Sequence, residues 1–513
     1  MENYMKEDRT GVKITAPICD RLAAPELTCD LSLPDYLPEI KRLLRVKAIV
    51  LPPERYVGTG NADFSGTVRY TVLYAGNDGQ LYSTAENSEY HFSVPVEATP
   101  DFEWNEGVVS DCEVGAEYTV GRVIAPRKLS VKCRLKAHVR LYGKLFLSET
   151  VTGADRKSVQ RLFGHCDAAE FFSGVGEPLH LADEVLCDAK EGDLRVVLAE
   201  GQVFVTEACA GSQSVNCRGE VAIKLLLASD TSPTVQTVVR RIPFTQDVPT
   251  DGVAVNCEAV ATGCCSDIQV SVEDNRILCE LEIILQTRAQ RNVQLTFTRD
   301  LYSTESECES KYAAVAIPRA IRCASGNISL NTTLPLSEIG LRPGLSLIDL
   351  SITPTVNALE NEGGKYVLTG RARCQATLGE RDEELMHEFE IPFRYECEGN
   401  REPVKDWSAT AEIISSRGRL DSERIGVDAE LAITLTTRTE SEVRLLREAH
   451  FASPIGKCRS VYTICYPART DTLWSVAKRY HRSVDTVAAA NGLSDAPHAD
   501  SPESLSGVKY LLV

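Results

Sequence analysis

The stretch Asp471–Tyr480, DTLWSVAKRY, is the most specific part of this 513-residue sequence. Its apolar residues recur at helical spacing, i, i+3, i+4 and i+7, and form one face: Leu473, Val476, Ala477 and Tyr480. Asp471 stands before the first of them, where its carboxylate can accept the free amides of a first helical turn. The stretch therefore predicts a short helix capped by Asp471.

The flanking residues extend this helix into a small α+β unit, residues 459–513. An alternating strand, Val461–Tyr466, precedes it, and Ser483 is the cap of a second helix. The inward face of that second helix is predicted to consist of Val484, Val487 and Ala488. Asn491-Gly492 ends the helix, because glycine readily adopts a left-handed conformation there. Val508–Val513 supplies a closing strand, so the order is strand, helix, helix, strand.

This order and the Thr-Leu-Trp of residues 472–474 resemble a LysM domain. LysM domains hold N-acetylglucosamine polymers in a groove between two loops, and most carry Gly-Asp before Thr-Leu-Trp. This chain has Thr470-Asp471 instead. The resemblance implies that the following residues line the groove or a partner-binding face: Arg469, Thr470, Asp471, Thr472, Asn491, Gly492 and Leu493.

Three further residues of the first helix are candidate binding residues. Trp474 lies beside the apolar face, where it can pack or contact a ligand. Lys478 and Arg479 form a basic patch with Arg482. Residues 459–513 hold six Lys/Arg and five Asp/Glu, a charge of +1, whereas the other 458 residues hold 49 against 68, a charge of −19. The patch is thus opposite in sign to the rest of the chain.

Residues before 459 contain a repeat with a period near 150. A glycine within an alternating strand recurs at Gly66, Gly219 and Gly370, with separations of 153 and 151 residues. An apolar-Pro-apolar triplet recurs as VPV, IPF and IPF, centred on residues 95, 243 and 392, and a further alternating strand is centred on residues 135, 281 and 431. Alternation with polar partners is typical of antiparallel strands that have one solvated face.

The predicted fold class is therefore mainly β. We expect a lead segment, 1–24, and three tandem antiparallel β-rich repeat domains, 25–152, 177–304 and 328–450, followed by the α+β unit, 459–513. The connectors are expected near residues 153–176 and 305–327. The strongest helical signal in the repeats is Pro38–Arg45.

Tandem β modules followed by a LysM domain resemble the SPOCS-domain, spore-coat-associated proteins of endospore-forming Firmicutes. Two stretches carry the resemblance, Leu33–Lys41 (LPDYLPEIK) and Arg299–Ser303 (RDLYS). The resemblance implies an adaptor in spore coat assembly whose LysM domain binds a coat morphogenetic ATPase. The first nine residues show no apolar signal-peptide region, so we expect the mother-cell cytoplasm, at the forespore surface, as its location.

Several other functions are not expected. The sequence has no phosphate-binding loop, GxGxxG after a strand, HExxH or GxSxG, so we expect neither catalysis nor a cofactor, and one His165-Cys166 pair is too little for a metal site. The acidic body argues against nucleic acid, and no apolar run is long enough to insert into a membrane. The scattered 18 cysteines, including Cys133, Cys279 and Cys374 on inward strand positions, are expected to be reduced.

Two functional hypotheses stay open. In the first, the chain is a non-enzymatic adaptor that docks a protein through the LysM domain. In the second, the LysM domain binds peptidoglycan or a related N-acetylglucosamine polymer, and the repeats are spacers.

Overall fold

The computed structural model describes most of the chain, with gaps between the described ranges: 10–97, 101–104, 107–152, 158–186, 194–229, 235–273, 276–380, 383–400, 402–456, 463–493 and 499–513. The expected fold class is confirmed, because β-strands dominate and the two short α-helices lie near the C-terminus. Among the described residues, no helix has the length and hydropathy needed to cross a membrane.

The strands fall into three successive sets that follow the sequence repeat. The first set is β1 (Thr10–Ala23), β2 (Glu26–Ser32), β3 (Ile40–Val50), β4 (Glu54–Val57), β5 (Asn61–Gly76), β6 (Leu81–Pro95), β7 (Val108–Ala125) and β8 (Lys128–Thr152). The second is β9 (Val159–Val175), β10 (Leu179–Leu186), β11 (Leu194–Ala210), β12 (Ser214–Ser229), β13 (Val235–Pro249), β14 (Glu258–Glu273) and β15 (Arg276–Ser303). The third is β16 (Ser306–Pro335), β17 (Ser346–Glu362), β18 (Lys365–Glu380), β19 (Glu383–Glu398), β20 (Asp406–Leu420) and β21 (Arg424–Pro454).

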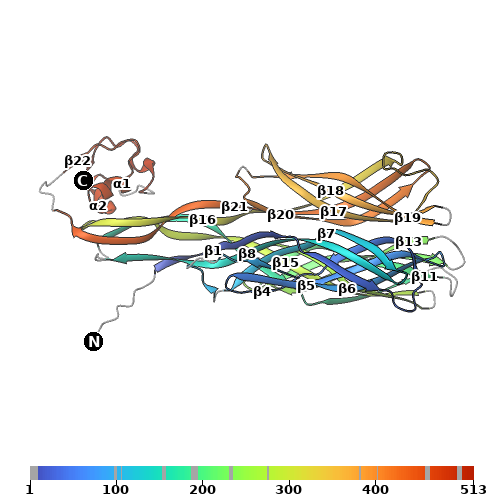
Figure 1. Cartoon of the computed structure of the whole chain (residues 1–513). Helices are drawn as coiled ribbons and strands as arrows, with labels where there is room; N and C mark the ends of the chain where they lie inside the picture. Colours follow the sequence, from blue (N-terminus) through green and yellow to red (C-terminus); the bar gives the residue numbers. More distant parts are fainter. Residues whose placement is uncertain are drawn as a thin grey trace, which may run out of the picture.

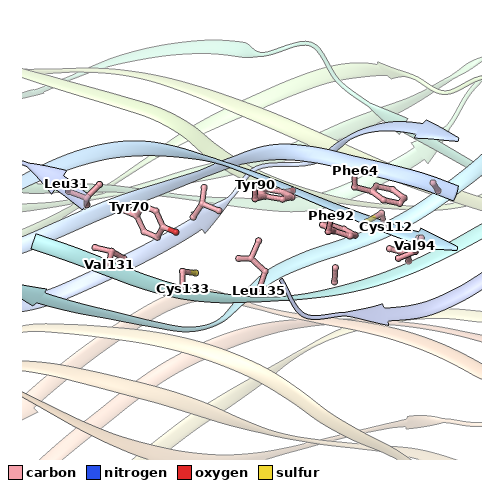
Figure 2. Close-up of a cluster of buried hydrophobic side chains, with 14 of the residues drawn as sticks. Leu31, Phe64, Tyr70, Tyr90, Phe92, Val94, Cys112, Val131, Cys133 and Leu135 are labelled. Carbon is pink, nitrogen blue, oxygen red and sulfur yellow. The ribbon is translucent and has the colours of Figure 1, made fainter. Parts of the chain in front are cut away.

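Each set folds as a sandwich of two antiparallel sheets. One sheet is β3–β5–β6, β11–β12–β13 or β17–β18–β19, with β4 added to the first. The other contains the long last strand of the set, β8, β15 or β21, between the penultimate strand and the leading strand or strands. Alternate residues of both sheets point into the sandwich, as in the first repeat, where Phe64, Tyr90 and Phe92 stack between the sheets (Figure 2).

The repeated glycines are explained by cross-strand aromatic rings. A Cβ at Gly66 would lie 2.6 Å from the Tyr90 hydroxyl oxygen. At Gly219 and Gly370 it would lie 2.8 and 2.2 Å from ring atoms of the phenylalanines opposite, Phe244 and Phe393. Any larger residue would displace these core rings, so the glycine and its aromatic partner are one feature of each repeat.

The two expected connectors are strands, which corrects the predicted boundaries. β9 and the first half of β16 occupy residues 159–175 and 306–320, and β1 occupies most of the expected lead segment. Each pairs along the second half of the last strand of its own repeat and forms a two-stranded ribbon beyond the sandwich. The repeats therefore span residues 10–152, 158–303 and 306–454. Small residues such as Ala168 and Ala169 are buried on opposite faces of β9, so the alternation of apolar and polar residues is weak in this part of the sequence.

The helical signal at Pro38–Arg45 does not correspond to a helix, because this segment enters β3. A β-bulge between Leu43 and Arg45 inserts Leu44 as an extra residue. The bulge breaks the period of two and leaves a spacing of apolar residues that resembles a helix. The same bulge recurs in the other two repeats, at Val197 of β11 and Ile348 of β17.

The three repeats pack side by side around a common core, with the ribbons running together from the sandwiches toward the C-terminal module (Figure 1). One hydrophobic cluster takes a residue from each of the six ribbon strands: Ile14, Leu147, Ala168, Phe297, Ile317 and Leu445. A second cluster, near the far end of the sandwiches, unites the bulge residues Leu44, Val197 and Ile348. The body therefore has an approximate threefold arrangement within a single chain.

Between these clusters, three arginines converge on one aspartate of the first repeat. Arg140, Arg288 and Arg438 come from the last strands β8, β15 and β21, and their nitrogens lie 2.8, 2.8 and 3.3 Å from the carboxylate of Asp111. Burial alone would raise the pKa of Asp111, but the three guanidinium charges hold it well below its usual range. Asp406 of the third repeat shares Arg140 and Arg438.

We predict that Asp111→Asn lowers the thermal unfolding midpoint strongly. Removing one partner from a buried charge network leaves the remaining charges uncompensated, which costs about 3–5 kcal/mol. The matched control is Asp428→Asn, which breaks a half-exposed pair with Arg419 and should cost about 0–1 kcal/mol. Scanning calorimetry of both variants checks the difference, and equal midpoints would contradict the role of Asp111.

The same carboxylate predicts the direction of acid sensitivity. Its folded-state pKa is below the unfolded value, so its contribution is complete above the unfolded pKa of about 4 and is lost as pH falls toward the folded pKa. The difference in midpoint between wild type and Asp111→Asn should therefore shrink as the pH is lowered below about 4. A constant difference over that range would contradict this assignment.

Candidate functional site

The C-terminal module, residues 463–513, contains β22 (Ile464–Cys465), α1 (Leu473–Arg479), α2 (Val484–Ala490), the 3-10 helix η2 (Pro502–Leu505) and β23 (Leu511–Leu512). The expected order of strand, helix, helix and strand is confirmed, with η2 as an addition. Val461 and Tyr462, expected in the first strand, lie outside the described residues. The expected apolar faces pack together: Leu473, Val476, Ala477 and Val487 are buried.

Helix α1 begins one residue later than expected. Thr472 is the cap: its hydroxyl accepts the Ser475 amide at 3.1 Å, and the Ser475 hydroxyl accepts the Thr472 amide at 2.9 Å. Asp471, the expected cap, instead accepts the Ala468 amide at 2.9 Å and forms an ion pair with Arg479 at 2.6 Å. The hydrogen bond and charge of Arg479 lower the pKa of Asp471. These contacts of the Asp471 carboxylate join the turn 468–471 to the last turn of α1, so Thr472 is left to cap the helix.

The second helix agrees with the sequence. Ser483 caps it by accepting the Thr486 amide, and Gly492 follows its end with φ +69°. The Asn491 amide group donates to the Val487 and Leu512 carbonyls and accepts the Leu512 amide, each at 2.8 Å. Asn491 thus ties α2 to β23, and Leu493 packs against the module core.

Trp474 and Lys478 point into the β body. The Trp474 indole nitrogen donates to Asp300 Oδ2 at 2.8 Å, and Lys478 Nζ lies 2.6 and 2.8 Å from the two Asp300 oxygens. The Tyr312 hydroxyl donates to the same carboxylate at 2.6 Å. Partial burial alone would raise the pKa of Asp300, but these hydrogen bonds and the lysine charge lower it. Three donors from two parts of the chain therefore share one carboxylate.

Tyr302 and Asp300 together form the surface of the β body on which the module docks, called the seat from here on. The Tyr302 ring meets the Trp474 ring edge-on with centroids 4.9 Å apart, and the Tyr302 hydroxyl donates to the Arg482 carbonyl at 2.7 Å. His481 contacts the Ser303 carbonyl at 3.1 Å, and Arg299 pairs with Asp500 at 2.7 Å. The end of β15 and the start of β16 thus hold one face of α1, which Figure 1 shows as the module resting against the ribbon end.

This arrangement divides the candidate binding residues into two groups. Trp474, Lys478 and Arg479 already have partners within the chain, so the predicted free basic patch is reduced. Arg469 and Thr470 are exposed in the turn before α1, and Gly492 is exposed after α2. Thr472, Asp471, Asn491 and Leu493 have structural roles in the module. Whether any of these residues contacts a ligand stays a prediction.

Sequence reasoning did not identify Asp300 and Tyr302 as part of a site. The stretch RDLYS was notable only as a family resemblance. A signal was nevertheless present: the second ribbon ends in this polar, aromatic stretch, whereas the ends of β8 and β21 read SETVT and HFASP. A stretch that ends the last strand of one repeat and is absent from the ends of the same strand in the other two indicates a contact with a part of the chain outside the repeats.

The described cysteines are thiols, and several of them are buried within the sandwiches. Burial raises the pKa of the Cys374 thiol to about 12, so it is not a thiolate near neutral pH. Cys133, Cys279 and Cys374 are buried as expected, and none of the 16 described cysteines forms a disulfide. No group of three or more His, Cys, Asp or Glu side chains in the described parts is placed to hold a metal ion.

Comparison with known families identifies residues 469–496 as a LysM domain. This match begins at the turn before α1 and extends beyond α2, so it covers the part of the module on which the resemblance rested. No curated protein and no solved structure matches the chain. The C-terminal module is thus a LysM domain fixed to a β body through Asp300 and Tyr302.

We predict that Asp300→Ala releases the LysM domain from the body without unfolding either part. The change removes the acceptor of Trp474 and the counter-charge of Lys478 together. Hydrogen exchange read by mass spectrometry should show faster exchange in β15 near residues 299–303 and in α1. Asp500→Ala, which removes only the more exposed pair with Arg299, is the matched control. Unchanged exchange in Asp300→Ala would contradict the docking role.

Proposed function

We propose that this chain is a non-enzymatic adaptor that presents a LysM domain at a fixed position on a three-lobed β body. The observation that carries the proposal is the seat formed by Asp300 and Tyr302, which fixes α1 on one side. The turn containing Arg469 and Thr470 stays exposed. An adaptor benefits from this geometry, because a binding surface that is already oriented loses less entropy when it engages its ligand.

The ligand class best supported is an N-acetylglucosamine-containing glycan. LysM domains bind such glycans, and the match over residues 469–496 includes both stretches that the resemblance implies as groove-lining, 469–472 and 491–493. One feature that would favour an acidic protein ligand is a free basic helix face. Lys478 and Arg479 are neutralised by Asp300 and Asp471, so that face offers little attraction for an acidic protein.

The test is calorimetric titration of the full chain with N-acetylglucosamine oligomers. We expect saturable binding with a Kd on the order of micromolar, about −8 kcal/mol. Thr470→Gly should strengthen binding several-fold, because a glycine lets the backbone of the loop approach a sugar more closely. Asp485→Asn, on the exposed side of α2, is the control and should bind like wild type. Absence of binding in all three proteins would reject the glycan proposal.

A second candidate is the spore coat adaptor, in which the LysM domain docks a coat morphogenetic ATPase at the forespore surface from the mother-cell cytoplasm. One observation favours it: Arg299–Ser303, one of the two stretches that resemble SPOCS-domain proteins, is the seat of the LysM domain. If this hypothesis holds, the purified ATPase should bind the full chain and fail to bind residues 1–456. Binding of glycan oligomers without binding of the ATPase would favour the first candidate instead.

A further inference from the structure

The paired strands identify equivalent positions in the three repeats. Arg42, Arg195 and Ser346 occupy the same place in the first strand of the outer sheet, because they stand opposite Ala75, Ala228 and Gly379. Across the hairpin turns, Ala75, Ala228 and Gly379 pair in turn with Leu81, Val235 and Glu384. At this position, one of the three interfaces between repeats differs from the other two.

At this position, an arginine forms a hydrogen bond across two of the three interfaces between repeats. Arg195 of the second repeat donates to the Leu81 carbonyl of the first at 2.7 Å. Arg42 of the first repeat donates to the Glu384 carbonyl of the third at 2.8 Å. The equivalent Ser346 of the third repeat is too short to reach the second, and its hydroxyl donates to Gly379 of its own repeat at 3.3 Å.

A second arginine is also replaced at this interface. Arg69 and Arg373 reach the backbone carbonyls of bulge residues in the neighbouring repeat, at 3.3 and 3.4 Å. The equivalent position of the second repeat is Ala222, opposite Arg241 on β13. Arg241 reaches the equivalent bulge carbonyl, that of Ile414, at 2.9 Å. The space that an arginine at position 222 would fill is left open.

The interface between the second and third repeats accordingly contains a cleft of about 570 Å³. Both Ala222 and Val235 line it, together with residues of β17 and β20. A volume of this size lies within the range of small-molecule sites. Ala222 lines the cleft and Ser346 directly precedes the lining residue Leu347, so both side-chain replacements lie at this cleft.

The charge of the lining is opposite to that of the chain. Four cationic side chains line the cleft, Lys47, Lys224, Arg241 and Arg417, against two carboxylates, Glu200 and Asp349. Both carboxylates are buried and already form ion pairs: Arg45 lies 2.8 Å from each. Lys47 lies 3.3 Å from Glu200, Lys224 pairs with Asp349, and Arg241 lies 3.2 Å from Glu220, so Arg417 is the lining cation without such a pair among the described residues. Burial would raise the pKa of Glu200, but Arg45, Lys47 and Lys224 lower it to about 2. The lining thus retains excess positive charge in a protein whose net charge is −18.

An apolar wall accompanies these cations. The residues that form it come from both repeats: Phe204, Val235, Val239, Leu347, Ile348 and Ile413. Val239 is 56% exposed, which is high for a valine on a strand face. Arg417, Ser415 and Ser416 lie exposed along β20 at the same cleft and supply hydrogen-bond donors.

We propose that this cleft binds a small organic anion that has an apolar portion. The anionic group lies near Arg417, and the apolar portion lies against Val239 and Ile348. This site is separate from the LysM domain and does not depend on the ligand of that domain.

The probe for the test is 8-anilinonaphthalene-1-sulfonate, an aromatic anion whose fluorescence rises in apolar surroundings. We expect saturable, one-site binding to the full chain. Ser346→Arg restores the residue type of Arg42 and Arg195, so its guanidinium should donate to the Val235 carbonyl and fill the cleft. Binding should fall by about tenfold or more, equivalent to about 1.4 kcal/mol. Ser346→Ala is the matched control and should bind like wild type.

A second variant keeps the test decisive if Ser346→Arg does not fold. Arg417→Glu reverses an exposed charge at the cleft and should weaken binding to a similar extent. Arg371→Glu reverses an exposed charge on β18 and should leave binding unchanged. Three results would overturn the proposal: no saturable binding by wild type, wild-type binding by a folded Ser346→Arg, or equal loss in Arg417→Glu and Arg371→Glu.

Discussion

The convergence of Arg140, Arg288 and Arg438 on Asp111 is the interaction on which the body depends. Each arginine comes from the last strand of a different repeat, so the carboxylate binds all three repeats at once. Buried ion pairs contribute little net stability relative to apolar packing, but they penalise wrong arrangements, because any shift leaves a charge buried and unpaired. The apolar ribbon core favours association, and the charges fix the relative positions of the repeats.

The docking surface of the LysM domain and the cleft both lie where the sequences of the three repeats differ. The seat of the LysM domain exists only at the end of the second ribbon, where Asp300 and Tyr302 have no equivalents. The cleft lies between the second and third repeats, where Ala222 and Ser346 stand at positions that hold arginines in the other repeats. A threefold body with identical interfaces would offer neither feature. The sequence differences among copies are therefore as informative as the similarities that reveal the repeat.

Local patterns predicted the parts of the structure that local interactions determine. The glycine positions, the alternating strands, the cap at Ser483 and the turn at Gly492 all follow from nearest neighbours along the chain or across one strand pair. The predictions are wrong where contacts between residues far apart in the sequence determine the structure. Leu44 of the first bulge packs against the other two repeats. The leading strands bury small residues against distant ribbons, so their sequence pattern resembles that of connectors. Lys478 and Trp474 could not be assigned to Asp300, which lies more than 170 residues away in the sequence.

The central claim is that the three repeats share one core and that their leading strands belong to it. Native-state hydrogen exchange of β9 and of residues 306–320 of β16 tests this claim most directly. The account predicts that these amides exchange as slowly as those of β15 and β21, with which they pair. Exchange within seconds along both segments, with slow exchange confined to the three sandwiches, would show that they are connectors between independent domains and would contradict the account.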